Sequence, residues 1–268
     1  MRPRTPRYRA VLFDLFDTLV RFDRERLPVV EIAGRAVHST VGRLHDVLRG
    51  WAPHVTVEAL YGALTESWRE AERRRAIDHR EVAAPERFAH LFRCLEMDPD
   101  ACPSGLVTEM LETHRGELAR AAEFPAHHRP LLEDLRRRYR LAVVSNFDYT
   151  PTAIGILREA GVADLFETIV VSDAVGWRKP APTIFQETLS RMGLEARDAL
   201  FVGDRADIDV AGALAVGMDV AWMNPASDPL PADLGAPTYE LRDLDDLRAI
   251  LVDPADAASA GRPHASKE

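Results

Sequence analysis

The sequence has little cysteine, almost no lysine and no long apolar run. Two cysteines in 268 residues are too few for a four-thiolate zinc site or for a framework of several disulfides. No apolar stretch reaches the ~18 residues that a membrane span needs. The basic start of the chain is not followed by the apolar segment of a signal peptide. These absences favour a protein of the reducing cytoplasm that does not enter membranes.

The charge balance is acidic. Lys and Arg total 34 against 43 Asp and Glu, and the formal net charge is −9. A nucleic-acid binder usually presents a basic face, so a small-molecule partner is favoured. Of the basic residues 32 are arginine, and the lysines are Lys179 and Lys267. A lone interior lysine in so arginine-rich a chain suggests a task for a compact ammonium group. Nothing in the sequence marks an oligomer interface.

Short apolar runs recur along the chain. They occupy residues 10–13, 141–144, 168–171, 199–202 and 219–222, and Tyr239-Glu240-Leu241 follows. Such runs are typical of strands buried on both faces of a parallel sheet. Helical apolar spacing separates them at 129–139 and 182–192. The alternation predicts a doubly wound, Rossmann-like α/β sheet.

The stretch between the first and second strands is far too long for one crossover. Apolar residues at helical spacing predict helices within 57–68, 88–95 and 107–118, with a weaker first helix over 29–48. We therefore expect an inserted, all-helical cap. The predicted domains are a core at 1–21 and 122–252, a cap at 22–121, and a disordered tail at 253–268.

Polar side chains stand where the strands end. The candidates are Asp14, Asp17 and Thr18, then Ser145 and Asn146, then Lys179, and finally Asp204, Asp207 and Asp209. Parallel strands present their carboxyl ends at one edge, so these groups should converge there. Crowded carboxylates repel unless a cation lies among them, and hard oxygen ligands suit Mg²⁺. With a hydroxyl and an ammonium nearby, the edge suits a phosphoryl group.

Taken in order, the four motifs resemble the haloacid dehalogenase (HAD) superfamily, which contains many phosphatases, and the helical insertion resembles its cap. The resemblance implies that the Asp14 carboxylate is the nucleophile and forms an aspartyl-phosphate. It implies a catalytic set of Asp14, Thr18, Ser145 and Lys179, and phosphate binding by Ser145, Asn146 and Lys179. The implied Mg²⁺ ligands are Asp14, the main-chain carbonyl of Phe16, Asp204 and Asp209.

The first motif departs from the phosphatase pattern. Superfamily phosphatases usually carry, two residues after the nucleophile, an Asp that protonates the leaving group and later activates water. Here that residue is Phe16, which can do neither. Such acid–base help is worth ~10²–10⁴-fold in rate. Asp17 lies next to it, but a one-residue offset tends to aim its side chain elsewhere.

Three functions remain open. The first is Mg²⁺-dependent phosphoryl transfer on a small phosphorylated metabolite, with activity weakened by Phe16. The second is hydrolysis of a 2-haloacid, because dehalogenating members carry an aromatic residue at this place. The third is a catalytically weakened binding protein. A phosphonate hydrolase with a cap lysine is disfavoured because residues 19–121 contain no lysine. Phosphoryl transfer is favoured because Asp204 and Asp209 have no clear use without a metal.

Overall fold

A parallel sheet of six strands forms the centre of the protein. The computed structural model describes residues 8–103 and 105–251, so the predicted tail at 253–268 lies outside the described residues. In pairing order the strands are β10 (Tyr239–Leu241), β9 (Asp219–Met223), β8 (Ala199–Gly203), β1 (Ala10–Phe13), β6 (Arg140–Ser145) and β7 (Thr168–Val171). Every neighbouring pair is parallel, so the carboxyl ends of all six lie at one edge. The predicted α/β sheet is confirmed.

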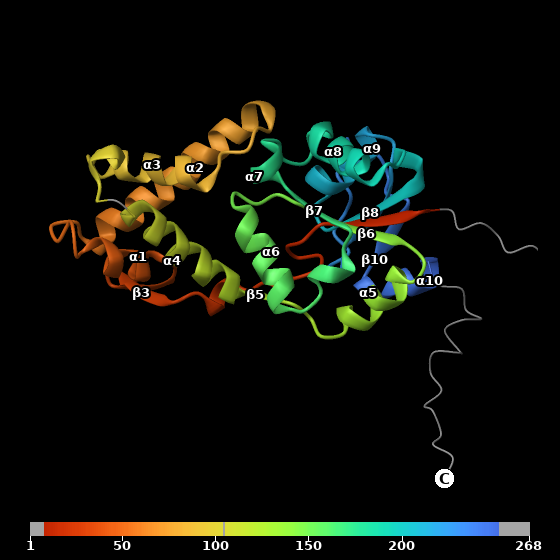
Figure 1. Cartoon of the computed structure of the whole chain (residues 1–268), viewed down its shortest axis with the longest axis horizontal. Helices are drawn as coiled ribbons and strands as arrows, with labels where there is room; N and C mark the ends of the chain where they lie inside the picture. Colours follow the sequence, from red (N-terminus) through yellow and green to blue (C-terminus); the bar gives the residue numbers. More distant parts are fainter. Residues whose placement is uncertain (1–7, 104, 252–268) are drawn as a thin grey trace, which may run out of the picture.

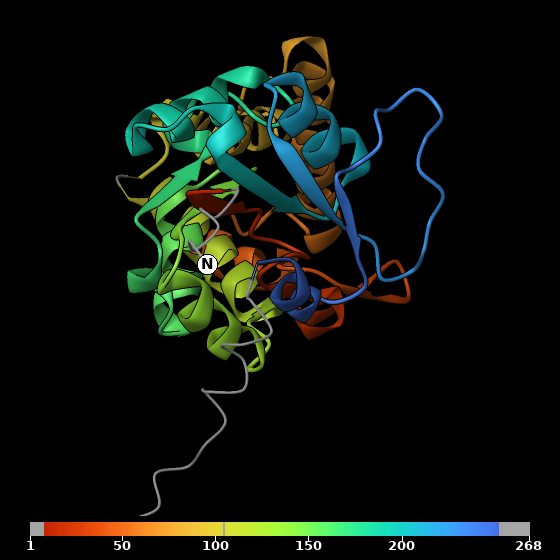
Figure 2. The same cartoon turned by 90° about the vertical axis from the view of Figure 1, so that its right-hand side faces the viewer.

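Helices cover both faces of this sheet. One face carries α5 (His128–Arg136), α6 (Thr150–Glu159) and α10 (Leu247–Leu251), and the other carries α8 (Pro182–Met192) and α9 (Ala211–Ala215). Along β1, Val11 and Phe13 belong to one buried cluster, whereas Ala10 and Leu12 belong to the other. Side chains alternate along a strand, so a strand covered on both faces must be apolar throughout. Figure 2 shows the sheet between these two layers of helices.

Short helical turns complete the fold. They are η1 (Arg24–Arg26), η2 (Pro99–Ala101), η3 (Ala163–Leu165), α7 (Ser172–Val175), η4 (Ala196–Asp198), the π-helical η5 (Ala206–Val210) and η6 (Leu244–Asp246). Two of them matter for the site. Turn α7 leads from β7 toward Lys179, and η5 follows β8 and carries Asp209.

The cap is a separate helical layer beside the sheet. Its helices in the described residues are α1 (Val41–Leu48), α2 (Val57–Asp78), α3 (Ala84–Cys94) and α4 (Leu106–Ala121). They pack around an apolar core of their own, which includes Leu44, Leu60, Phe88 and Met110. Figure 1 shows them grouped at the left of the sheet. The predicted helical cap is confirmed, but it is not all helical, because it also contains a β-hairpin.

The predicted helix over residues 29–48 is wrong in its first half. Residues 29–38 form an antiparallel hairpin of β3 (Val29–Ile32) and β4 (Arg35–His38), and the helix begins only at Val41. Ala33 and Gly34 join the two strands with φ angles of +49° and +75°. A two-residue turn with both φ angles positive matches the twist of a hairpin. This local turn therefore prevails over the helical spacing.

The chain enters and leaves the cap at one place. Strand β2 (Arg21–Phe22) pairs antiparallel with β5 (Ala122–Glu123). The Asp23 amide also donates to the Ala121 carbonyl at 3.0 Å. This pairing joins the two crossings into one narrow connection, which we call the hinge. The domain limits given above stay predictions.

Helix α2 is the longest element of the cap, with 22 residues. It is rich in Arg and Glu, and within residues 8–103 and 105–251 no helix is both long and apolar enough to cross a membrane.

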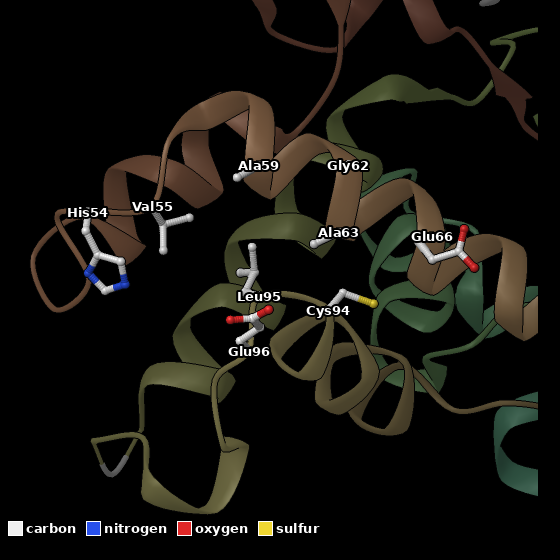
Figure 3. A pocket seen from close by; sticks show the side chains of 9 residues that line it. All are labelled: His54, Val55, Ala59, Gly62, Ala63, Glu66, Cys94, Leu95 and Glu96. Atoms are coloured by element: carbon white, nitrogen blue, oxygen red, sulfur yellow. The ribbon is translucent and has the colours of Figure 1, made fainter.

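Between α2 and the end of α3 lies an open hollow of about 560 Å³, lined by residues that include Ala63, Glu66 and Cys94 (Figure 3). No predicted catalytic residue lines this hollow.

A second contact, remote from the hinge, joins the cap to the core. The segment after α2 forms an antiparallel bridge between Arg80 and Trp177, in the loop that leads to Lys179. The neighbouring Glu81 side chain is only 1% exposed and forms ion pairs with Arg75 at 2.6 Å and Arg178 at 2.9 Å. It also accepts a hydrogen bond from the Ser172 hydroxyl. One buried carboxylate thus joins cap helix α2 to the loop that precedes Lys179.

We expect Glu81→Gln to destabilise the protein by about 3–5 kcal/mol, because it removes the carboxylate that pairs with Arg178 and one of the two that pair with Arg75. Guanidinium unfolding measures this loss. The matched control is Glu86→Gln, since Glu86 pairs with Arg74 at 2.7 Å but both side chains are nearly half exposed. An exposed pair contributes about 0–1 kcal/mol. Equal losses of unfolding free energy in the two variants would contradict a stabilising role for the buried Glu81 ion pairs.

Candidate active site

The candidate site lies at the carboxyl edge of the sheet, beside the central strand β1. Phe13, the last residue of β1, is in register with Val143 of β6 and Val202 of β8. Asp14 follows at once, and its amide donates to the Val202 carbonyl at 2.8 Å. The edge therefore brings Asp14 between the strands that end in Ser145 and Gly203.

Lys179 is buried among carboxylates. Its side chain is 1% exposed, and its ammonium forms ion pairs with Asp14 and, at 2.8 Å, with Asp209. Burial lowers the pKa of Lys179, but the two carboxylates outweigh this effect and raise the pKa above its usual value. The ammonium is therefore charged and holds the predicted nucleophile directly.

Asn146 positions Lys179 through the backbone. Its side-chain amide donates to the Lys179 carbonyl at 2.9 Å, and its side-chain oxygen accepts from the Lys179 amide at 2.7 Å. Both polar atoms of the side chain are used in this way. These two bonds give Asn146 a positioning role, and its predicted contact with phosphate stays a prediction.

Three carboxylates form one cluster. Asp14, Asp204 and Asp209 each offer an oxygen, and these oxygens all lie within 4.8 Å of one another. Burial raises the pKa of Asp14, Lys179 lowers it and Asp209 raises it, with a resulting value of about 7. Burial, followed by the charges of Asp14 and Asp209, raises the pKa of Asp204 to about 8. A divalent cation would relieve this repulsion, and an all-oxygen donor set suits Mg²⁺.

Gly203 makes room for Asp209. A Cβ atom added at Gly203 would lie 2.5 Å from Cγ of Asp209, closer than packed atoms approach. The Asp209 carboxylate is also held by the Arg205 amide at 3.0 Å. The glycine before Asp204 is therefore required for the cluster to close.

Two buried hydroxyls at the site are unpartnered. Thr18 and Ser145 are 3% and 0% exposed, and within the described part of the chain neither side-chain oxygen has a hydrogen-bond partner. An unpaired buried hydroxyl costs free energy. A phosphoryl group would supply the missing acceptors, so this observation fits an oxyanion ligand.

Phe16 belongs to a group of aromatic rings. Its half-buried ring lies 5.1 Å from that of Phe147 and 6.0 Å from that of Phe22, measured between centroids. These rings come from the loop after β1, the loop after β6 and the cap hinge β2. We call the three the aromatic wall. The sequence reasoning did not single out Phe147, although it follows Ser145 by two residues, as Phe16 follows Asp14.

Both the backbone and the side chain of Asp17 belong to a local turn. Its φ angle is +59°, its side chain is exposed, and its carboxylate accepts from the Phe22 amide at 3.0 Å. Its charge contributes to the raised pKa of Asp204.

The predicted metal contact of the Phe16 carbonyl stays a prediction. Asp207 pairs with Arg205 at the surface and lies outside the cluster.

Comparison with known proteins extends this picture. The model of one family, the haloacid dehalogenase-like hydrolases, matches residues 8–217. A glyceraldehyde 3-phosphate phosphatase of Pyrococcus abyssi is 28% identical over 214 residues, which cover 80% of each chain. The HAD-hydrolase YfnB of Bacillus subtilis is 26% identical over 247 residues, which cover 91% of this chain and 96% of YfnB.

Solved structures share the fold over most of the chain. A 2-haloacid dehalogenase from Pseudomonas syringae superimposes with a TM-score of 0.65 at 26% identity, over 91% of this chain and 98% of that one. The magnesium-bound structure of YfnB superimposes with a TM-score of 0.59, over 92% of this chain and 100% of that one.

The match over residues 8–217 agrees with the sheet, the cap and the order of the polar groups along the chain. The protein belongs to the haloacid dehalogenase-like hydrolases, and it is a hydrolase.

Proposed function

We propose that the protein hydrolyses phosphate monoesters of small metabolites, with Mg²⁺ and through an aspartyl-phosphate on Asp14. The observation that carries the proposal is the buried cluster of Asp14, Asp204 and Asp209 with the ammonium of Lys179. A phosphatase among the relatives supports this choice of substrate class.

In the first step, a carboxylate oxygen of Asp14 attacks phosphorus. The bond from phosphorus to the leaving oxygen breaks, and its electron pair departs with the leaving group. Lys179 keeps the Asp14 carboxylate oriented, and the unpartnered hydroxyls of Thr18 and Ser145 donate to phosphoryl oxygens. Positioning and charge of this kind provide most of the catalysis of phosphoryl transfer.

In the second step, water attacks phosphorus and the bond to Asp14 breaks. The Asp14 carboxylate is regenerated, and inorganic phosphate leaves with the hydroxyl of that water. The proton released by water passes to the phosphate itself or to solvent, since Phe16 cannot accept it. Splitting the displacement in two is ordinary nucleophilic catalysis.

The carboxylate cluster fits a divalent cation. Asp14, Asp204 and Asp209 would hold it, and the raised pKa values of Asp14 and Asp204 are what such a set has without one. When bound, Mg²⁺ would neutralise charge that develops on the phosphoryl oxygens. The magnesium in the YfnB structure supports this assignment.

A 2-haloacid dehalogenase is the second candidate, and Phe16 is the observation that favours it. A halide leaves without a proton, so the chemistry does not need an acid at this position. The superposition with the P. syringae dehalogenase supports it as well. Chloride release from 2-chloropropionate, with no release of phosphate from any phosphate ester, would favour this candidate.

We expect Mg²⁺-dependent release of phosphate from 4-nitrophenyl phosphate, whose leaving group needs little protonation. Asp14→Asn should abolish the activity, because the amide is a poor nucleophile. A colorimetric phosphate assay with and without Mg²⁺ measures both. The control is Asp207→Asn, since Asp207 lies outside the cluster. Turnover that survives in Asp14→Asn, or its absence from the wild type at every Mg²⁺ concentration, would refute the proposal.

The carboxylate cluster should also make the metal-free protein less stable as the pH rises. A pKa of Asp204 raised to about 8 means that the folded state keeps a proton that the unfolded state loses near pH 4. Stability should therefore fall between about pH 4 and pH 8. With a chelator present, Asp204→Asn should flatten this fall and raise the melting temperature at pH 8. A wild type and variant with parallel pH profiles would contradict the interpretation.

Magnesium should make the wild type more stable than Asp204→Asn, the opposite of what we expect without metal at pH 8. At a hundred times its dissociation constant, a ligand of the folded state stabilises it by about 2.7 kcal/mol. We expect Mg²⁺ to raise the melting temperature of the wild type but hardly that of Asp204→Asn. An equal rise in both proteins would place the metal elsewhere.

A further inference from the structure

We infer that the preferred substrates are phosphate esters or mixed anhydrides whose leaving group is planar and conjugated and departs as a stabilised oxyanion, as in aryl and enol phosphates and in acyl phosphates. The inference rests on the proposed function and narrows its substrate class. It rests on the aromatic wall of Phe16, Phe22 and Phe147 and on the position of Asp17.

We place the rest of the substrate against the aromatic wall. The phosphoryl group is expected at the closed end of the site, among Asp14, Ser145 and Lys179, whose side chains are all buried. The wall is made of half-buried rings from the two loops beside this end and from the cap hinge β2. What is attached to the phosphoryl oxygen therefore passes between core and cap against ring carbons.

The wall provides no proton. Phe16 packs on Phe147 at 5.1 Å and on Phe22 at 6.0 Å, so its position is filled by a ring that has ring neighbours on two sides. A leaving alkoxide there would develop full negative charge against apolar surface. The cost of an unpaired charge in such surroundings is high.

Asp17 does not replace the missing acid in this geometry. Its carboxylate is exposed and accepts a hydrogen bond from the Phe22 amide at 3.0 Å. Its backbone, with φ of +59°, belongs to the turn that closes between the Asp17 amide and the Val20 carbonyl. The side chain therefore binds the backbone of the hinge and does not face the substrate.

Lys179 lies on the wrong side to act as the acid. In an in-line displacement the leaving group departs opposite the nucleophile. The Lys179 ammonium is ion-paired with the nucleophile Asp14 itself and with Asp209. It therefore serves the attacking side of phosphorus.

The first step then balances without a proton. The Asp14 oxygen forms its bond to phosphorus, the bond from phosphorus to the leaving oxygen breaks, and the electron pair stays on that oxygen. Conjugation with a ring, a double bond or a carbonyl spreads the charge. A planar group of this kind also packs well on aromatic rings.

The test compares kcat/KM for two esters that carry the same ring, phenyl phosphate and benzyl phosphate, with Mg²⁺ present. The phenolate leaves easily, whereas the benzyl alkoxide needs a proton. We expect kcat/KM for benzyl phosphate to be lower by about 10²–10⁴-fold, the usual worth of general acid catalysis. Comparable values would overturn the inference while leaving the phosphatase proposal intact. If neither ester nor 4-nitrophenyl phosphate is hydrolysed, the proposed function itself fails.

Variants at the wall identify the cause. Phe16→Asp should raise the ratio of benzyl to phenyl kcat/KM by about 10²–10⁴-fold, because it supplies an acid. Phe16→Asn is the matched control and should leave the ratio low, because asparagine resembles aspartate in size and polarity but has no acidic proton to transfer. An equal rise in both variants would mean that packing sets the preference. Hydrolysis of benzyl phosphate by the wild type that is lost in Asp17→Asn would show that Asp17 provides the proton, and the inference would be wrong.

Discussion

The ion pairs of the Lys179 ammonium with Asp14 and Asp209 are the interaction on which the rest of the site depends. They join the loop after β1 and the turn η5 to the loop after α7, and these three segments lie far apart in the sequence. All three charges are almost completely removed from water. Removing one partner from such a set leaves uncompensated buried charge, at a cost of about 3–5 kcal/mol. The ammonium also lowers the pKa of Asp14 against the effect of burial, and it holds the nucleophile in position.

The surrounding structure is organised to maintain that cluster. Parallel pairing puts Asp14 between the ends of β6 and β8, and Gly203 leaves the space that Asp209 occupies. Asn146 holds the backbone of Lys179 at both its amide and its carbonyl. Glu81 fixes the preceding loop to the cap. One short segment therefore connects the cap to the loop that carries the catalytic lysine.

Much of the fold could be predicted from the sequence, because strands buried on both faces leave uniform apolar runs and the core helices keep strict spacing. The hairpin at 29–38 could not, because its turn uses Ala33-Gly34 rather than a typical Asn-Gly pair. At the edge of the sheet the charged residues were predictable from their place after each strand. The clamp by Asn146 and the aromatic wall were not, since both depend on how loops fold against one another. The orientation of Asp17, set by a positive φ, is likewise a property of the folded turn.

The most direct measurement is mass spectrometry of the enzyme quenched in acid during turnover of 4-nitrophenyl phosphate with Mg²⁺. We expect a phosphoryl group on the peptide that contains Asp14. It should accumulate, because Phe16 cannot activate the water that removes it. Asp14→Asn should show none. A phosphoryl group on another residue, or steady turnover with no modified peptide, would contradict Asp14 as the nucleophile.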